Sequence, residues 1–338
     1  MHTISRRALL LAAGAVWAGS ALSRRALASL RSRASALETF FPWQTIRERA
    51  HVSIDATLGG NVLVVRGADG AVLVDTKFPS FSGTLRREAG AHGAPLAMVI
   101  NTHHHADHSG GNLAFHPDID LLAHPKAKER IGSQLDRYRS LAEGGWRQID
   151  SARAGAAKVI DEAHAVADRA QALTPDAFTP TLTPEAFPHE AAVAGERVEL
   201  HHAGAGHTDN DLIVRFPELN LIHTGDLVFH TLHPYFDPPG GSNSEGWVRS
   251  LEAARALCDN DTIVVPGHGP LTDATGIDRQ RDYLLRLREA VAEGLRAGAT
   301  KEELQARTWP FMEGLGFEQV RSRAIGAVCD ELAAPTGG

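Results

Sequence analysis

The chain has 338 residues, of which 43% are hydrophobic and 22% are charged, so it can bury the core of an ordinary globular protein. Its formal net charge of -7 excludes a general basic field, and we therefore expect no nucleic-acid partner. Two cysteines, Cys258 and Cys329, are too few for a four-cysteine zinc site or a disulfide scaffold. Two interpretations of them stay open: buried thiols, or one disulfide formed in an oxidising compartment.

The first residues resemble an export signal. The stretch "ISRRALLLAAGAVWAGSAL" begins with Arg6 and Arg7 and continues as an apolar run over about 8–22, which is short for a span of roughly 20 residues. An "ALA" site at 26–28 suits a signal peptidase, and the paired arginines resemble a twin-arginine signal. We expect residues 1–28 to be removed on export to the periplasm, with no stable membrane association afterwards. An uncleaved anchor or a misjudged start codon is the alternative.

The rest of the chain, 37–338, is expected to form one folded domain. Short runs rich in Val, Ile and Leu recur and end in Gly, Pro, Asp or His: "NVLVVRG", "AVLVDT", "LAMVINTH", "LIVRFP", "LNLIHTGD" and "TIVVPGHG". Such runs are typical of buried strands with polar residues at their ends. The turn residues at 68–70 join the first two runs as a hairpin. Early hairpins followed by strand–helix alternation predict a layered α/β protein with functional groups on the loops.

Helices are predicted in four places. The stretch "SFSGTLRREAGAHG" indicates a helix that is capped by a serine and ends near Gly93. Residues of about 127–172 are polar and alanine-rich, and we interpret them as an insertion with two helices rather than a second domain. The part 278–332 is expected to be mostly helical, with a capping box in "TKEEL" at Thr300. A second capping box, in "SNSE" at Ser242, is expected to open the helix of "GWVRSLEAARAL".

The stretch "NTHHHADHSGGN" places four histidines and an aspartate directly after the apolar run "LAMVI". Residues two apart on an extended segment point the same way, so His103 and His105 can converge on one ion where the strand ends. A turn then brings Asp107 and His108 round the other side of the loop. Neutral imidazole and carboxylate groups suit zinc. The spacing therefore predicts a metal site.

A tetrahedral zinc needs more ligands than one segment supplies, and three further strand ends carry candidates. His207 follows a glycine-rich turn in "HHAGAGHTDND". Asp226 ends the apolar run of "LIHTGDLVF", and His268 ends that of "TIVVPGHGP". Polar ligands that recur at strand ends indicate one shared centre.

The ordered set HxHxDH, GHT, TGD and PGHG resembles the metallo-β-lactamase superfamily over roughly Val52–Asp273. The resemblance implies a four-layer αββα sandwich, here with a helical insertion and C-terminal helices, that holds two zinc ions at one edge. It implies that His103, His105 and His207 hold one ion and that Asp107, His108 and His268 hold the other. Asp226 would bind both ions as a bridge.

The chemistry expected of such a centre is hydrolysis of an acyl bond in a small molecule: a β-lactam, lactone, thioester or ester. A hydroxide that bridges the metals would be the nucleophile, Asp107 would ligate and orient it, and no serine or cysteine nucleophile is required. One group of zinc β-lactamases has a cysteine where Asp226 stands, so the pattern is closer to glyoxalase II and lactonase members. The alternatives are an iron oxidoreductase resembling the persulfide dioxygenases, and a binding protein with an inert metal.

The remaining polar and aromatic residues receive weaker expectations, and the sequence indicates no oligomeric state. Two interpretations are open for Thr102, Thr208 and Thr224. They are partners that fix the imidazole tautomers, or only polar residues at strand ends. His104 is expected to face away from the ligands, whereas His230 and His233 are candidates for the pocket mouth. We expect core or supporting roles for His201, His202 and His223, and solvent exposure for His51, His92, His164 and His189. An apolar mouth is predicted from the insertion, the C-terminal helices and the loop 229–244, with Tyr235, Phe236 and Trp146.

Overall fold

The computed structural model of the chain describes residues 39–92 and 95–334 and divides the chain into two units, Met1–Thr39 and Phe40–Gly338. The elements below belong to the second unit. The predicted signal at 1–28 and the predicted helix end at Gly93 lie outside the described residues. Within the described parts of the chain, no helix is both long and apolar enough to cross a membrane.

Two mixed β-sheets form the centre of the second unit. The six-stranded sheet has the order β1–β2–β3–β4–β5–β6, with antiparallel pairs from β1 to β4 and parallel pairs from β4 to β6. Its strands are β1 (Trp43–Arg47), β2 (Ala50–Ser53), β3 (Val62–Arg66), β4 (Ala71–Val74), β5 (Leu96–Ile100) and β6 (Asp120–Leu122). The predicted hairpin is confirmed, because β3 and β4 pair with Leu63 opposite Val74.

The five-stranded sheet has the order β11–β10–β9–β8–β7, and only its β10–β11 pair is parallel. Its strands are β7 (His189–Val193), β8 (Glu196–His201), β9 (Ile213–Phe216), β10 (Leu221–His223) and β11 (Ile263–Val265). All the apolar runs that the sequence indicated as strands are strands here. The short β10 and β11 end at His223 and Val265, a few residues before two of the predicted metal ligands, Asp226 and His268.

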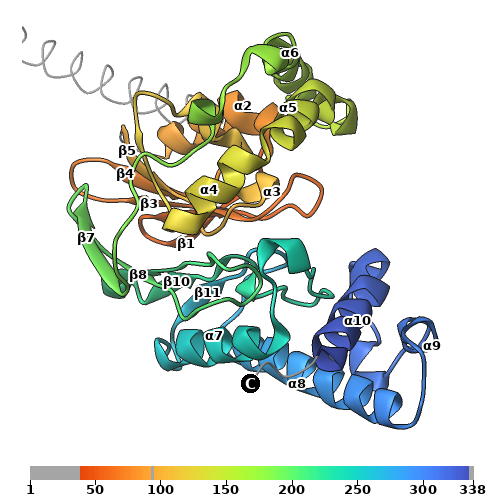
Figure 1. Cartoon of the computed structure of the whole chain (residues 1–338). Coiled ribbons are helices and arrows are strands. Elements are labelled where there is room, and N and C mark those ends of the chain that lie inside the picture. The colour runs from red at the N-terminus through yellow and green to blue at the C-terminus, as the bar shows by residue number, and fades with distance from the viewer. Residues whose placement is uncertain (1–38, 93–94, 335–338) are drawn as a thin grey trace, which may run out of the picture. The chain divides into compact units, whose positions relative to one another are not determined.

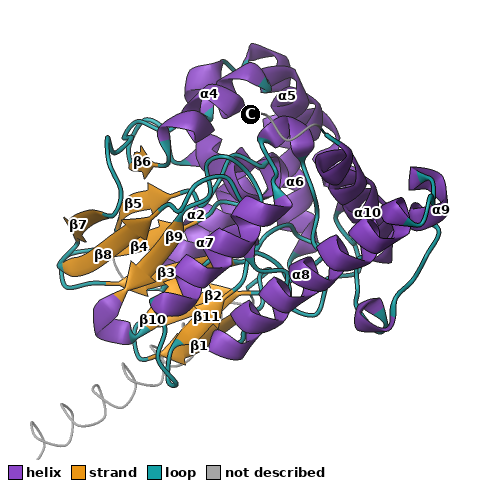
Figure 2. Ribbon diagram, turned by 60° about the horizontal axis from the view of Figure 1, so that its bottom comes forward, coloured by secondary structure: helices purple, strands orange, loops and turns teal. Residues whose placement is uncertain are grey.

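Helices cover the outer face of each sheet, which confirms the predicted four-layer arrangement (Figure 1). Helices α2 (Ser82–Ala91) and α6 (Ala156–Ala167) pack on the first sheet, and α7 (Ser244–Ala256) and α8 (Ala274–Arg296) pack on the second. Figure 2 shows α7 and α8 side by side across the strands of the second sheet. Helices therefore leave the ends of the strands to the connecting loops.

Central strands such as β3 are apolar on both faces because each face meets a different layer. In β3, Val62 and Val64 belong to the core shared with α2 and α6. The alternate residues Leu63 and Val65 belong to the core between the two sheets. Burial on both sides explains why these strands read as continuous apolar runs rather than as an alternating pattern.

The predicted insertion contains three α-helices, α4 (Pro125–Ser133), α5 (Leu135–Gly144) and α6, so the expectation of two helices was wrong. Only Gln134 separates α4 from α5, and their polar patterns merge in the sequence. A break before α6 is set by Gly155, whose φ of 75° lies in the left-handed region that favours glycine. The helices enclose a small core of their own around Tyr138 and Phe178.

The C-terminal part is helical as predicted, with α8, α9 (Lys301–Gln305) and α10 (Glu318–Ala333). The capping box of Thr300 and Glu303 at the start of α9 is confirmed. The two other predicted caps were wrong. Asn243, not Ser242, caps α7 by accepting a hydrogen bond of 2.6 Å from the Gly246 amide. Helix α2 begins at Ser82 without any side-chain cap.

The two cysteines are free thiols. Cys329 is buried in the core that α7, α8 and α10 share, and Cys258 packs partly against the same core. Burial raises the pKa of the Cys258 thiol to about 11. Of the two interpretations, the structure therefore has thiols rather than a disulfide.

The core between the sheets should carry much of the stability of the fold. Phe216 on β9 is fully buried there, and we expect Phe216→Ala to lower the free energy of unfolding by roughly 3–5 kcal/mol. Leu285→Ala is the matched control, because this leucine is 46% exposed on α8, and it should cost less than about 0.5 kcal/mol. Urea unfolding followed by circular dichroism measures both values. A loss at Phe216 no larger than that at Leu285 would contradict the described core.

Candidate metal centre

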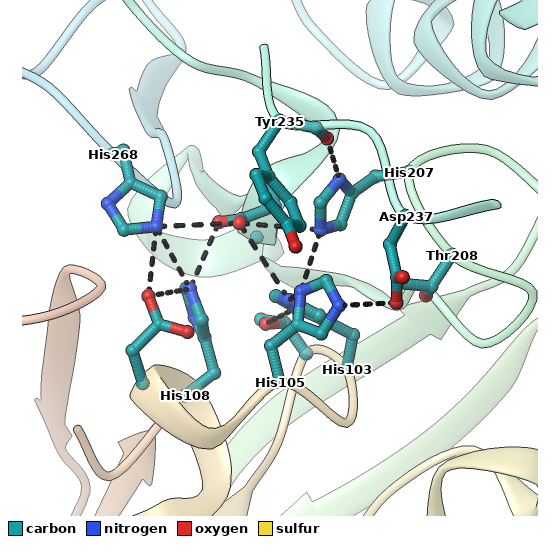
Figure 3. A network of polar contacts seen from close by, with 12 residues as sticks. His103, His105, His108, His207, Thr208, Tyr235, Asp237 and His268 are labelled. Carbon is teal, nitrogen blue, oxygen red and sulfur yellow. Dashed lines mark hydrogen bonds and ion pairs between the residues drawn. The ribbon is translucent and has the colours of Figure 1, made fainter. Parts of the chain in front are cut away.

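The predicted metal-binding residues lie on loops and short helices that follow strands (Figure 3). The loop after β5 carries His103 and His105, and it leads into the single-turn helix α3 (Ala106–Ser109). Asp107 and His108 belong to this turn. The other three residues follow β8, β10 and β11 and are His207, Asp226 and His268. The structure brings all seven together. Metal binding by these residues stays a prediction.

Three imidazoles and a carboxylate form the first group. The Nδ1 atom of His105 lies 3.1 Å from His103 Nε2 and 3.0 Å from His207 Nε2. Asp226 Oδ2 lies 3.8 Å from His103 Nε2 and 3.4 Å from His207 Nε2. All four side chains are buried, and their ligand atoms are within 4.8 Å of one another. This geometry suits one metal ion held by nitrogen and oxygen atoms.

Asp107, His108 and His268 form the second group. The Nε2 atoms of the two histidines lie 3.4 Å apart, and Asp107 Oδ2 is 3.6 Å from that of His108 and 3.2 Å from that of His268. Asp226 also faces this group, with Oδ1 at 3.0 Å from His108 Nε2 and Oδ2 at 3.4 Å from His268 Nε2. The carboxylate of Asp226 therefore lies between the two groups.

Polar partners outside the second group orient the imidazole of His108. Asp75 follows β4, is fully buried, and places Oδ2 at 2.7 Å from His108 Nδ1. The same carboxylate accepts hydrogen bonds from the Thr102 amide and hydroxyl, at 2.7 and 2.8 Å. The Thr102 oxygen lies 3.1 Å from His103 Nδ1. Protons on these outer nitrogens leave the inner Nε2 lone pairs for a metal ion.

The imidazoles of His105 and His207 are held in the same way from the other side. Asp237 Oδ2 lies 3.0 Å from His105 Nε2, and the backbone carbonyl of Tyr235 lies 3.0 Å from His207 Nδ1. Both acceptors belong to the loop before α7, and Figure 3 shows Tyr235 and Asp237 beside the two rings. Each of them favours the tautomer whose inner nitrogen is unprotonated.

The carboxylates of the site attract positive charge. Burial by itself lowers the pKa of His108 and of His268, but Asp226 and Asp107 outweigh it. As a result, the pKa of His108 is well above its ordinary value and that of His268 is raised to about 9. Burial dominates at His207, where it lowers the pKa to about 3. The protein part of the site thus favours added cations near Asp107 and Asp226.

The donor set fits two metal ions. Ring nitrogens that face one another at 3.0–3.4 Å cannot all be satisfied by protons, whereas a cation between them satisfies each lone pair. Asp226 Oδ1 is buried and accepts no hydrogen bond, although His108 Nε2 lies nearby. Gly267 leaves room for this oxygen, since a Cβ there would lie 1.9 Å from it. These are buried His/Asp groups of the kind that dinuclear centres use.

The polar residues around the ligands were predicted only in part. Thr102 contacts an imidazole as expected, but Thr208 donates to Asp211 and the Thr224 hydroxyl faces backbone carbonyls. Sequence reasoning missed Asp75 and Asp237. Asp75 stands at the end of "AVLVDT", and it had the same strand-end signal as the ligands. Asp237 lies in an irregular loop and had no signal of this kind.

Several expectations for the other histidines were wrong. His104 lies outside the two groups, and its buried ring packs beside that of His105 while its Nδ1 atom lies 3.0 Å from the Asn210 side-chain amide. His233 is buried against Tyr283 and Glu318 instead of lining a mouth. His51 and His92 stack on each other at 4.4 Å and are only half-exposed.

Of the aromatic residues predicted at the mouth, Tyr235 alone contacts the ligands. Its ring centre lies 5.8 Å from that of His105 and 6.4 Å from that of His207. Phe236 is buried against Trp247, and Trp146 packs on His164 in the insertion. The prediction of a mouth lined by all three was therefore wrong.

The sequence model of the metallo-beta-lactamase superfamily matches residues 56–268, which is more than half of the chain. The chain therefore belongs to the metallo-β-lactamase superfamily. A curated relative is metallo-beta-lactamase IND-1 of Chryseobacterium indologenes, which is 28% identical over 76 residues. This alignment covers 22% of this chain and 32% of the relative, so the chain matches about a third of the length of that protein.

Solved structures with the same fold include two β-lactamases and a sulfatase. A metallo-beta-lactamase from Pontibacter korlensis has a TM-score of 0.52 at 18% identity, over 72% of this chain and 99% of that chain. DIM-1 metallo-beta-lactamase has a TM-score of 0.53 at 19% identity, over 73% and 97%. A double mutant of the sec-alkyl sulfatase PisA1 has a TM-score of 0.60 at 14% identity, over 87% and 50%. These likenesses show the fold.

The partners of the imidazoles should matter for metal affinity. Asp75→Asn keeps the shape of the side chain but replaces a carboxylate oxygen that faces both His108 and Thr102. We expect the variant to bind zinc roughly 10- to 100-fold more weakly. Competition with a chromophoric chelator measures the affinity, and Asp69→Asn in the exposed hairpin turn is the control. Equal zinc affinity of the two variants would contradict the role given to Asp75.

Proposed function

We propose that this protein is a binuclear zinc hydrolase that cleaves an acyl bond in a small molecule. The observation that carries the proposal is the position of Asp226, whose buried carboxylate faces imidazoles of both groups at 3.0–3.8 Å. A centre with one metal would need only one of the groups. The ligand set of imidazole nitrogen and carboxylate oxygen suits zinc.

The ligands fall into two sets with one shared member. One ion would be held by His103, His105 and His207, the other by Asp107, His108 and His268, and Asp226 would reach both. Two zinc ions held there would supply Lewis acidity and a water of lowered pKa. Asp107 is the residue best placed to orient that water, because its side chain is 21% exposed while the neighbouring ligands are nearly enclosed.

Tyr235 is proposed to contact the substrate. Its ring lies beside those of His105 and His207 of the first group, at centroid distances of 5.8 and 6.4 Å (Figure 3). The guanidinium of Arg323 stacks over the ring at 4.5 Å, and the backbone carbonyl of Tyr235 is fixed by His207. A phenol held in this way can donate a hydrogen bond to the oxygen that gains charge as an acyl bond is attacked.

The substrate classes to test are a β-lactam, a lactone, a thioester and an ester. The fold likeness to a sec-alkyl sulfatase adds an alkyl sulfate to this panel. A mononuclear iron oxidoreductase is the competing function, and the second group of ligands argues against it. Metal analysis separates the two, because iron and zinc are distinguished directly by plasma mass spectrometry.

The test of the proposal is metal content measured together with turnover. We expect about two zinc ions per chain and hydrolysis of at least one member of the panel. In Asp226→Ala both groups lose their shared ligand, so metal content and turnover should fall together. Asp261→Ala, on a surface turn, is the control and should change neither. About one iron per chain without hydrolysis would overturn the proposal.

The role of Tyr235 can be tested by removing only its hydroxyl. Tyr235→Phe keeps the ring under Arg323 and the carbonyl beside His207. We expect kcat to fall by roughly 100-fold, because a donor to the developing charge is lost, with zinc content unchanged. Steady-state kinetics on the best substrate of the panel measures the change. An unaltered kcat would remove Tyr235 from the mechanism.

A further inference from the structure

A cavity of about 370 Å³ lies beside the first half of α8, and its walls contain none of the predicted metal-binding residues. The loop after η7 (Gly225–Leu227) and the segment before α10 form its other walls. Its volume is within the range of roughly 300–1,000 Å³ that is usual for small-molecule sites. Apolar side chains dominate the walls, namely Phe229, Leu232, Phe311 and Leu315.

The cavity is separate from the metal centre but adjoins it. Phe229 forms the partition, because it lines the cavity while its ring stacks on that of His268 at 5.2 Å and an interplanar angle of 14°. None of the seven predicted metal ligands lines the cavity. A molecule bound there would therefore contact the partition and not the metal ions.

Two arginines of α8 line the cavity, Arg279 and Arg286. Their spacing of seven residues, about two helical turns, puts them on the same side of the helix. Among the residues that the structure describes, neither guanidinium has an ion-pair or hydrogen-bond partner. Arg281 and Arg288 on the same helix do form ion pairs, with Asp282 and Glu331. The cations of this part of the helix without an ion pair or hydrogen bond are thus the two at the cavity, although Arg279 lies near enough to Asp273 to add to the hydrogen bonds from Thr275 in lowering the pKa of that carboxyl.

Gln280 supplies an independent sign of a missing partner. Its side chain lines the cavity and is only 5% exposed. The Oε1 atom accepts a hydrogen bond from the Phe229 amide at 3.2 Å, but the buried Nε2 donor has no partner. Asp282 is the one acidic residue on the cavity wall, and Arg281 holds its carboxylate at 3.0 Å. The free groups at the wall are therefore the Gln280 Nε2 donor, the two guanidinium groups and the Nε2 atom of His230, which is also buried without a partner.

We propose that this cavity binds a small amphiphilic acid, with its apolar body against Phe229, Leu232 and Leu315. The anionic group lies between Arg279 and Arg286, within reach of the Gln280 amide. An acid satisfies the free donors and cations, whereas a neutral apolar molecule would leave them unpaired. The site is distinct from the proposed hydrolytic centre and does not depend on it.

The probe is octanoate, which is titrated into the full-length chain by calorimetry. The control ligand is 1-octanol, which has the same chain length but no charge. We expect octanoate binding to weaken at least about tenfold in the double variant Arg279→Gln/Arg286→Gln, because charge-assisted contacts are lost. Binding of 1-octanol should not change. Arg296→Gln, an exposed arginine near the end of the same helix, is the control and should bind octanoate normally.

A second variant and a metal-free arm keep the result decisive. Leu315→Glu puts a carboxylate on the apolar wall and should weaken octanoate binding as strongly as the double variant does. The carboxylate of octanoate could also bind to zinc in the metal centre. The titration is therefore repeated on Asp226→Ala, where octanoate binding should persist. Binding that disappears with Asp226, binding that survives both cavity variants, or no binding to the natural chain would overturn the proposal.

Discussion

A carboxylate that is only 3% exposed lies among four imidazole nitrogens, and the rest of the site is organised around it. A buried charge of this kind is costly unless it is paired. Asp226 meets that condition with both oxygens, Oδ2 toward His103, His207 and His268 and Oδ1 toward His108. One short turn after β10 thus joins the two groups of predicted ligands.

The fold holds Asp226 and the imidazoles around it in fixed positions. Strands β5, β10 and β11 precede all the predicted ligands except His207, and each contributes residues to two cores, so their ends cannot shift without disturbing both. A further layer of acceptors then fixes the rings. Asp75 follows β4 and holds His108, while Asp237 and the Tyr235 carbonyl hold His105 and His207 from the loop before α7. Both sheets therefore contribute predicted ligands, and residues that orient them, to the same place.

Sequence patterns predicted what periodicity and strand-end chemistry determine. Every apolar run that was predicted to be a strand is a strand in the structure. The polar residues chosen after these runs include all seven that the structure brings together. Contacts between distant segments were not readable. Trp146 and Phe236 were placed at a mouth because they are aromatic, yet each packs elsewhere, and Asp237 reaches His105 from an irregular loop. Helices α4 and α5 have one residue between them, so their sequences form one continuous helical pattern and the break was not predicted.

The most direct measurement of the central claim is X-ray absorption at the zinc edge of the fully metallated protein. If Asp226 joins two ions, the spectrum should show a metal–metal vector at roughly 3.5–4 Å and a shell of nitrogen and oxygen only. A metal shell without any metal–metal vector, in protein that has taken up all the zinc it can bind, would contradict the account. In that case the two groups would be separate, and Asp226 would belong to one of them.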